Sequence, residues 1–157
     1  MSNQRIPEIK IGKIKKSTRI AVITAIWNQD LTDHMLNQCN LTLADHGIKP
    51  TSIRVSGSFE LIAATKAAIN KKFDAVIALG VVLKGETPHF DYVCQAVTNG
   101  LTQIAAETGK PIGFGVLTCD NHAQAKARAG FPGSIEDKGR DTAMAVLNSL
   151  IEHKKLG

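Results

Sequence analysis

The chain has 157 residues, of which 43% are apolar, 21% are charged and 4% are aromatic, and its net charge is +5 at pH 7. This length fits one domain with a substantial core, and the apolar stretches are too short to cross a bilayer. Much of the positive charge lies at the two ends, between Lys10 and Arg19 and at Lys154 and Lys155. A nucleic-acid-binding face would interleave basic residues with aromatic ones, so we expect neither a nucleic-acid partner nor a membrane protein.

The N-terminus lacks the charged-then-apolar pattern of a secretory signal, so we expect a cytoplasmic protein. The three cysteines, Cys39, Cys94 and Cys119, are odd in number and far apart. This pattern is unlike a disulfide framework or a zinc site, and reduced, mostly buried thiols are expected. No two histidines share metal-ligand spacing with an acidic residue or a cysteine, so we expect no metal site.

Hydrophobic periodicity predicts a basic N-terminal arm, residues 1–18, with at most a short strand, followed by one domain, residues 19–157. Strands are predicted at residues 19–25, 53–55, 73–83 and 111–118. Helices are predicted at residues 31–46, 58–70, 88–108, 121–129 and 140–153. Alternation of strands and helices, with two helices at the end, predicts an α/β fold in which helices cover both faces of a four-stranded parallel sheet.

Ligands in such sheets bind at the carboxyl ends of the strands. The prediction is therefore geometric: a small number of sequence segments should meet at one edge of the sheet. These segments are Trp27 and residues 56–60, 81–89 and 114–118.

The central stretch is residues 78–92, Ala-Leu-Gly-Val-Val-Leu-Lys-Gly-Glu-Thr-Pro-His-Phe-Asp-Tyr. A strand buried on both faces stops at residues 84–85. Thr87 then caps a helix, and Pro88 takes the first helical position, where a missing N–H is tolerated. The open N–H groups and positive dipole end of such a helix start bind anions. Histidine is the residue type that exchanges protons near neutral pH, and His89 lies on this first turn.

Other residues near this edge have two interpretations each. Trp27 either covers the core or stacks on a flat heterocycle, and Phe59, after a glycine turn, has the same two roles. Phe114 is a core residue by default because it lies inside a strand. Glu60 is either a surface carboxylate favoured by the helix dipole or an acceptor for ligand hydroxyl and N–H groups. His89 is either a surface residue at a helix start or a catalyst.

Arg128 closes a short helix, where a basic side chain suits the dipole in any case, and Lys138 lies in a glycine-flanked loop, where solvation is the default. The chain has no Walker loop, no Gly-x-Gly-x-x-Gly and no Gly-x-Ser-x-Gly. The residues alone therefore indicate a small α/β protein that binds a phosphorylated or planar small molecule, with acid–base chemistry left open.

Residues 79–93 closely resemble the signature of the lumazine synthase family. Further segments agree in order and spacing: Trp27-Asn28, residues 54–61 (Arg-Val-Ser-Gly-Ser-Phe-Glu-Leu), residues 113–118 (Gly-Phe-Gly-Val-Leu-Thr) and residues 127–130 (Ala-Arg-Ala-Gly). The resemblance implies a flavodoxin-like three-layer sandwich. It also implies the penultimate step of riboflavin biosynthesis: 5-amino-6-(ribitylamino)uracil and 3,4-dihydroxy-2-butanone 4-phosphate condense to 6,7-dimethyl-8-ribityllumazine, phosphate and water, with no metal or organic cofactor.

The resemblance implies a role for each site residue. His89 would be the acid–base residue. The uracil and ribityl groups would contact Trp27, Ser58, Phe59, Glu60, Val81, Val82 and Leu83. The phosphate would bind Glu86, through its backbone N–H, and Thr87. A neighbouring subunit would add Phe114 to the pocket wall and Arg128 to the phosphate site, and Lys138 matches a basic residue near the same pocket.

The chain departs from the family pattern in four places. Ser56 replaces the usual Pro before the glycine, which makes that turn less rigid, and Trp27 replaces Phe, which changes the size of the pocket. The loop at residues 131–139 is longer than in capsid-forming relatives, and Asp137 stands where Asn is common.

Family members form pentamers with sites between subunits, and some assemble twelve pentamers into a hollow capsid. The longer loop favours a free homopentamer or a pair of pentamers. The alternative function is a non-catalytic flavin- or lumazine-binding protein, or a shell component, on the same scaffold. Such a protein would need neither His89 nor Arg128, and both are present.

Overall fold

The computed structural model describes residues 7–157, and its elements alternate as predicted. The strands form one parallel sheet in the order β2-β1-β3-β4. They are β1 (Ile20–Ala25), β2 (Thr51–Val55), β3 (Ala75–Leu83) and β4 (Ile112–Cys119). The helical elements are α1 (Gln29–Asp45), the short 3-10 helix η1 (Ser58–Glu60), α2 (Leu61–Asn70), α3 (His89–Thr108), α4 (His122–Lys126) and α5 (Lys138–Lys154).

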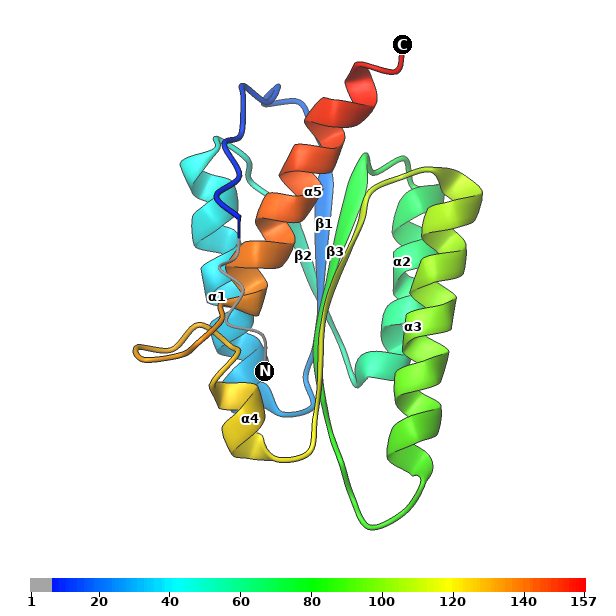
Figure 1. Cartoon of the computed structure of the whole chain (residues 1–157). Helices are drawn as coiled ribbons and strands as arrows, with labels where there is room; N and C mark the ends of the chain where they lie inside the picture. Colours follow the sequence, from blue (N-terminus) through cyan, green and yellow to red (C-terminus); the bar gives the residue numbers. More distant parts are fainter. Residues whose placement is uncertain (1–6) are drawn as a thin grey trace.

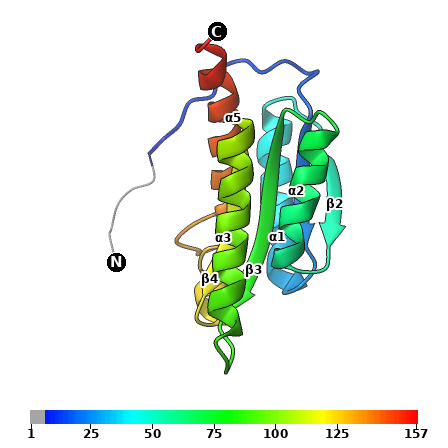
Figure 2. The same ribbon diagram turned by 90° about the vertical axis from the view of Figure 1, so that its right-hand side faces the viewer.

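The elements form three layers, with α1, α4 and α5 on one face of the sheet and α2 and α3 on the other (Figure 1). Figure 2 shows α3 running along β3, with the loop that joins them at the carboxyl end of the strand. The predicted flavodoxin-like α/β sandwich is therefore confirmed.

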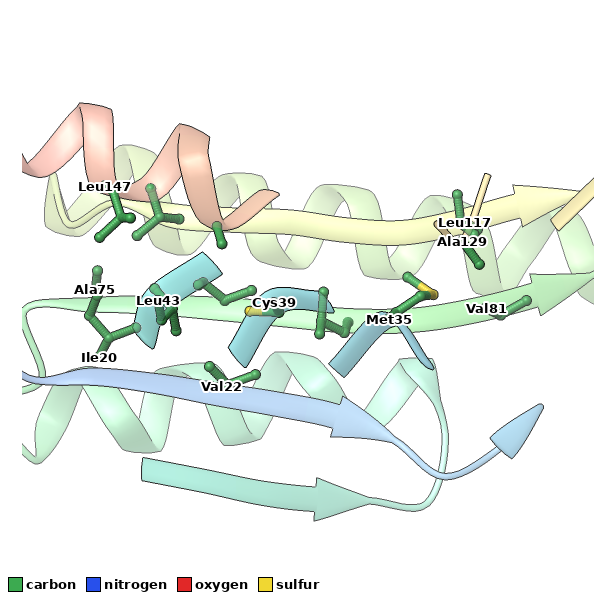
Figure 3. Packing of buried hydrophobic residues seen from close by; sticks show 14 of the residues in the cluster. Ile20, Val22, Met35, Cys39, Leu43, Ala75, Val81, Leu117, Ala129 and Leu147 are labelled. Atoms are coloured by element: carbon green, nitrogen blue, oxygen red, sulfur yellow. The ribbon is translucent and has the colours of Figure 1, made fainter. Parts of the chain in front are cut away.

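β3 is the centre of the core, and all its residues from Ala75 to Val81 are buried. One cluster fills the space between the sheet and the α1–α5 layer, where Met35, Cys39 and Leu43 of α1 meet Leu147 of α5 (Figure 3). A second cluster lies under α2 and α3. Burial on both faces explains why this strand is a nearly continuous apolar run rather than an alternating one.

The predicted starts of α1, β2, β3 and α5 were wrong by two residues each, and α4 ends at Lys126, three residues earlier than predicted. β3 begins at Ala75 rather than at residue 73, because the Phe73 N–H still bonds to the Ala68 carbonyl at the end of α2, 3.3 Å away. α5 begins at Lys138 rather than at residue 140, because the Asp137 carboxylate caps the helix and accepts from the Arg140 N–H at 3.1 Å. Lys138 is thus a first-turn helical residue, not a loop residue.

The described part of the predicted arm, residues 7–18, contains no strand, and the rest of the arm lies outside the described residues. Ile14 is buried in the core cluster on the α5 side, against which Ile151 also packs. The end of the arm is therefore attached to the domain by apolar contact.

The three thiols are free, and Cys39 and Cys119 are buried whereas Cys94 is half-buried. Burial raises the pKa of Cys39 to about 12. The Cys39 thiol is therefore neutral over the physiological pH range and functions as a small apolar side chain inside α1.

Gly139 sets the distance between α1 and α5. A Cβ atom at this position would collide with the backbone carbonyl of Met35 on α1. We expect Gly139→Ala to lower the free energy of unfolding by about 1–3 kcal/mol, because a backbone cannot move aside as a flexible side chain can. Urea unfolding measures this difference.

Gly85→Ala is the matched control, because a Cβ there has no atom within 4 Å and needs no unusual backbone angle. Both substitutions reduce the freedom of the unfolded chain equally, so the comparison isolates the helix contact. Equal unfolding midpoints for the two variants would contradict this account of the α1–α5 packing.

Candidate active site

A cavity of about 360 Å³ opens at the carboxyl edge of the sheet, between the β1–α1 turn, η1, the end of β3 and the start of α3. This volume is within the range of small-molecule sites. The cavity is lined by Trp27, Asn28, Gly57, Ser58, Phe59, Glu60, Val81, Val82, Leu83, Gly85, Thr87, His89, Phe90 and Val93. The loop between β3 and α3, which lies at the bottom of Figure 1, contributes Gly85 and Thr87 to this lining.

Aromatic side chains face this cavity without covering the core. The backbone of Trp27 is held in place because its N–H donates to the Ser56 carbonyl at 3.0 Å. Trp27 is 72% exposed and Phe59 is 57% exposed. The core interpretation therefore fails for both residues in the single chain, and both present an open ring to a ligand.

Polar groups for a ligand lie beside these rings. The Ser58 hydroxyl is buried and has no hydrogen-bond partner among the described residues. It sits over Gly80, where a Cβ would come within 2.5 Å of the Ser58 oxygen. A buried hydroxyl without a partner is costly, so a ligand that bonds to it would be favoured. The Glu60 carboxylate lies above Gly57 at the same wall, where a Cβ would meet its oxygen at 3.1 Å.

The loop into α3 offers backbone donors beside a histidine. The Lys84 N–H completes the sheet by donating to the Cys119 carbonyl at 3.0 Å. For the next N–H groups, those of residues 85–87, no acceptor is found within residues 7–157. The predicted cap was wrong by one residue: α3 begins at His89, so Pro88 and not Thr87 is its N-cap residue, although the Thr87 hydroxyl accepts from the His89 N–H at 3.4 Å. Open amides and a helix dipole attract an anion to the loop, with the His89 side chain at its border.

No Lys or Arg is among the described residues that line this cavity, and Glu60 is its one acidic residue. The predicted basic residues lie elsewhere. Arg128 Nη1 donates to the Gln124 carbonyl at 2.9 Å, and its Nε lies 3.8 Å from the Glu136 carboxylate. Lys138 Nζ lies 3.5 Å from the same carboxylate. Among the described residues, a site for a phosphorylated molecule in one chain therefore has amide donors but no Lys or Arg in its lining.

Phe114 is also outside the cavity, and the prediction that it would join the other segments within one chain was wrong. It pairs with Ala78 in the register of β3 and β4, which places it well before the carboxyl end of β4. Phe114 is 41% exposed, so it is not a core residue either. It shares a shallow hollow on the outer edge of the sheet with Lys138 and Thr142.

A family model described as 6,7-dimethyl-8-ribityllumazine synthase matches residues 17–154. The chain belongs to this family. Proteins named 6,7-dimethyl-8-ribityllumazine synthase are among its relatives: that of Streptomyces coelicolor is 47% identical over 148 residues, 94% of this chain and 91% of the relative. Those of Paenarthrobacter aurescens and Pseudarthrobacter chlorophenolicus are 48% and 46% identical over 160 aligned positions, 99% of each chain.

The site residues predicted from the lumazine synthase resemblance fall into two groups in the structure, one at the cavity and one away from it. The structure brings together nine of the predicted site residues that line one cavity: Trp27, Ser58, Phe59, Glu60, Val81, Val82, Leu83, Thr87 and His89. Glu86 lies in the same loop, between the lining residues Gly85 and Thr87. Phe114, Arg128 and Lys138 lie on β4, after α4 and at the start of α5.

Sequence reasoning assigned no role to Asn28, Phe90 or Val93, which also line the cavity. Phe90 and Val93 belong to the apolar face of α3. The spacing of apolar residues along the sequence does not distinguish those at the cavity from those in the core. Asn28 carries a detectable signal, because Asn directly after a strand is one of few residue types that tolerate a left-handed turn.

Within residues 7–157, no three His, Cys, Asp or Glu side chains are grouped so that they could hold a metal ion. None of the helices in this part of the chain has the length and apolar character that a membrane span requires.

Proposed function

We propose that the chain condenses 5-amino-6-(ribitylamino)uracil with 3,4-dihydroxy-2-butanone 4-phosphate to form 6,7-dimethyl-8-ribityllumazine, phosphate and water. The family match over residues 17–154 supports this activity. The observation that carries it in the structure is one cavity with an exposed tryptophan on one side and open loop amides beside His89 on the other. These two sides suit a flat heterocycle and a phosphorylated sugar fragment respectively.

The heterocycle would bind on the Trp27 side. Stacking on the indole suits the flat uracil ring, and Phe59 adds a second apolar surface. Ser58 has an unused hydroxyl, and Glu60 accepts hydrogen bonds from ring N–H or ribityl hydroxyl groups. The walls of this half of the site are Val81, Val82 and Leu83 at the end of β3.

The phosphate would bind in the loop before α3. Glu86 carries a negative side chain, so its contribution is its backbone N–H, together with the N–H and hydroxyl of Thr87. The positive end of α3 adds to the attraction. The loop amides leave the charge of a bound dianion uncompensated, and a cationic side chain that donates to the phosphate would hold it more strongly.

Arg128 of a neighbouring subunit would be that partner. Arg128, Phe114 and Lys138 lie outside the cavity of their own chain, and a rotationally repeated contact can bring them to the cavity of the next subunit. The active site would then be shared across each interface of a homopentamer. The Glu136 carboxylate lies near both Arg128 and Lys138 and would hold these side chains in place before a neighbouring subunit binds.

His89 would serve as the acid–base residue. The 5-amino group adds to the ketone, and loss of water gives an imine. Proton removal from the sugar fragment then allows the phosphate to leave, and the ribitylamino nitrogen closes the ring with loss of a second water. Every step moves a proton, so one imidazole can act repeatedly. Binding both substrates in one cavity supplies the remaining acceleration, with no metal or organic cofactor.

The loop between α4 and α5 is expected to affect how many pentamers associate. It projects away from the sheet (Figure 1) and is fixed to α1 by the Gln38–Asp137 hydrogen bond of 2.8 Å and by the His34–Phe131 ring stack of 3.9 Å. Ile135 in this loop is 59% exposed. A rigid loop with an outward apolar side chain suits a contact between pentamers that is limited to pairs.

Light scattering after size exclusion tests the assembly. We expect the mass of a pentamer, or of a pair of pentamers, of 16.8 kDa chains. If pairs form, Ile135→Asp should reduce them to single pentamers because it charges the contact. A capsid-sized particle, or a monomer, would contradict the proposed assembly.

The protein is proposed to act in the cytoplasm, where its three thiols stay reduced.

The activity itself is tested by mixing the two substrates with the protein and following the absorbance of the lumazine. The controls omit either substrate in turn. Product formation above the uncatalysed rate is expected. Binding of the lumazine without turnover would instead favour the non-catalytic binding protein on the same fold.

A further inference from the structure

We propose that Asn28 is a positioning residue: its side chain ties the turn that carries Trp27 to the end of β3, and so fixes the angle at which the indole faces the cavity. This inference rests on the proposed role of Trp27 as the surface on which the heterocycle stacks.

The carboxyl end of β3 has no strand partner on its β1 side. The pairing of β1 with β3 ends at Thr24 and Leu79, whereas β3 continues to Leu83 along β4. Asn28 Nδ2 donates to the Val81 carbonyl at 3.0 Å, in a half-buried position. The side-chain amide thus provides, beyond the end of β1, the donor that a longer β1 would have provided through its backbone.

The backbone at residue 28 restricts which side chains can do this. Asn28 has φ 60° and ψ 49°, the left-handed conformation, and its carbonyl accepts from the N–H groups of Leu31 and Thr32 at 2.9 and 3.0 Å to begin α1. Gly, Asn and Asp are the residues that tolerate this conformation best. Of these three, only Asn carries an N–H donor on its side chain.

Trp27 depends on this attachment because little else holds it. With 72% of the residue exposed, its ring has few packing contacts, and its own N–H donates to the Ser56 carbonyl at 3.0 Å. Ser56 lies in the turn after β2, and Val81 lies in the cavity wall. The two bonds therefore hold the turn from both sides, and loss of the Asn28 bond releases it from the wall that faces the ligand.

The chain contains one tryptophan, so its fluorescence reports on Trp27 alone. Asn28→Asp keeps the size and the tolerated backbone but places a carboxylate against a carbonyl, and Asn28→Gly keeps the backbone and removes the bond. We expect both variants to show faster local decay of Trp27 anisotropy in the absence of substrates. We also expect the KM for the uracil substrate to rise about tenfold, the effect of one hydrogen bond, while the KM for the phosphate substrate changes less than about twofold.

Gln29→Glu is the matched control, since it makes the same amide-to-carboxylate change one residue along, where the side chain has no hydrogen bond among those found in the described residues. It should leave both readouts as in the wild type. Unchanged Trp27 anisotropy in Asn28→Asp and Asn28→Gly would overturn the proposal, as would an equal rise in both KM values. The anisotropy measurement needs no substrate, so an inactive wild-type protein would refute the proposed function without deciding the role of Asn28.

Discussion

Replacing His89 with alanine should lower kcat for lumazine formation by about 10²–10⁴-fold, the usual contribution of a general acid–base residue. The KM for the butanone phosphate should change little, because the loop amides of residues 85–87, and not the imidazole, are the proposed phosphate donors. Steady-state kinetics with each substrate varied in turn separates these two parameters. A large fall in kcat with a constant KM identifies an interaction that is made mainly in the transition state.

His89→Gln is the informative companion variant, because glutamine keeps a hydrogen-bonding side chain at the start of α3 but cannot exchange a proton near neutral pH. It should be almost as slow as His89→Ala. The side chain of His89 is exposed, so neither variant should unfold the protein. A His89→Ala protein with wild-type kcat would remove His89 from the mechanism and would revive the non-catalytic alternative.

The fold was predictable because its strongest signals are local. The apolar run of β3 is buried on both faces, and only a central parallel strand combines that length with that composition. Gly109 ends α3 with φ 66°, in the left-handed conformation that terminates helices, as the position of this glycine predicted. The carboxyl-edge rule then placed Trp27, η1 and the β3–α3 loop together, and the cavity contains all three.

The remaining features depend on contacts that no local pattern records. The sequence predicts Lys138 as a loop residue because it lies between Asp137 and Gly139. In the structure the Asp137 side chain caps α5, so Lys138 is the first residue of that helix. Phe114 reads as core because it lies inside a strand, but β4 is the edge of the sheet and its outer side is open. Asn28 reads as one polar residue of a turn, and its importance depends on a carbonyl that is 53 residues further along the chain.

The family resemblance supplied what the residues alone could not, the assignment of Arg128 and Phe114 to a neighbouring subunit. The structure of one chain is consistent with that assignment in a specific way. Of the described residues that line the cavity, none is Lys or Arg, while the Arg128–Glu136–Lys138 group lies outside it. On the proposed assignment, a single chain carries two incomplete halves of a phosphate site, which neighbouring subunits would bring together.

Arg128→Ala should raise the KM for the butanone phosphate by about 10- to 100-fold, the effect of losing a charge-assisted hydrogen bond, with a much smaller change in kcat. Arg128→Lys keeps the charge but not the planar fork, so it should recover only part of the affinity. Arg128 also bonds to the Gln124 carbonyl and lies near Glu136 in its own chain. Thermal melting of both variants therefore checks that the kinetic change does not come from a destabilised α4–α5 loop.

Mixed assemblies decide which chain supplies the arginine. When His89→Ala and Arg128→Ala chains are unfolded, combined and refolded together, each interface of the proposed assembly would pair the cavity of one subunit with the Arg128 position of the next. With random mixing in a closed ring of heterologous contacts, about a quarter of the interfaces join an intact His89 to an intact Arg128. At low butanone phosphate the mixture should regain activity that neither variant has alone. If Arg128 served the cavity of its own chain, every site would retain one defect, and mixing would restore nothing.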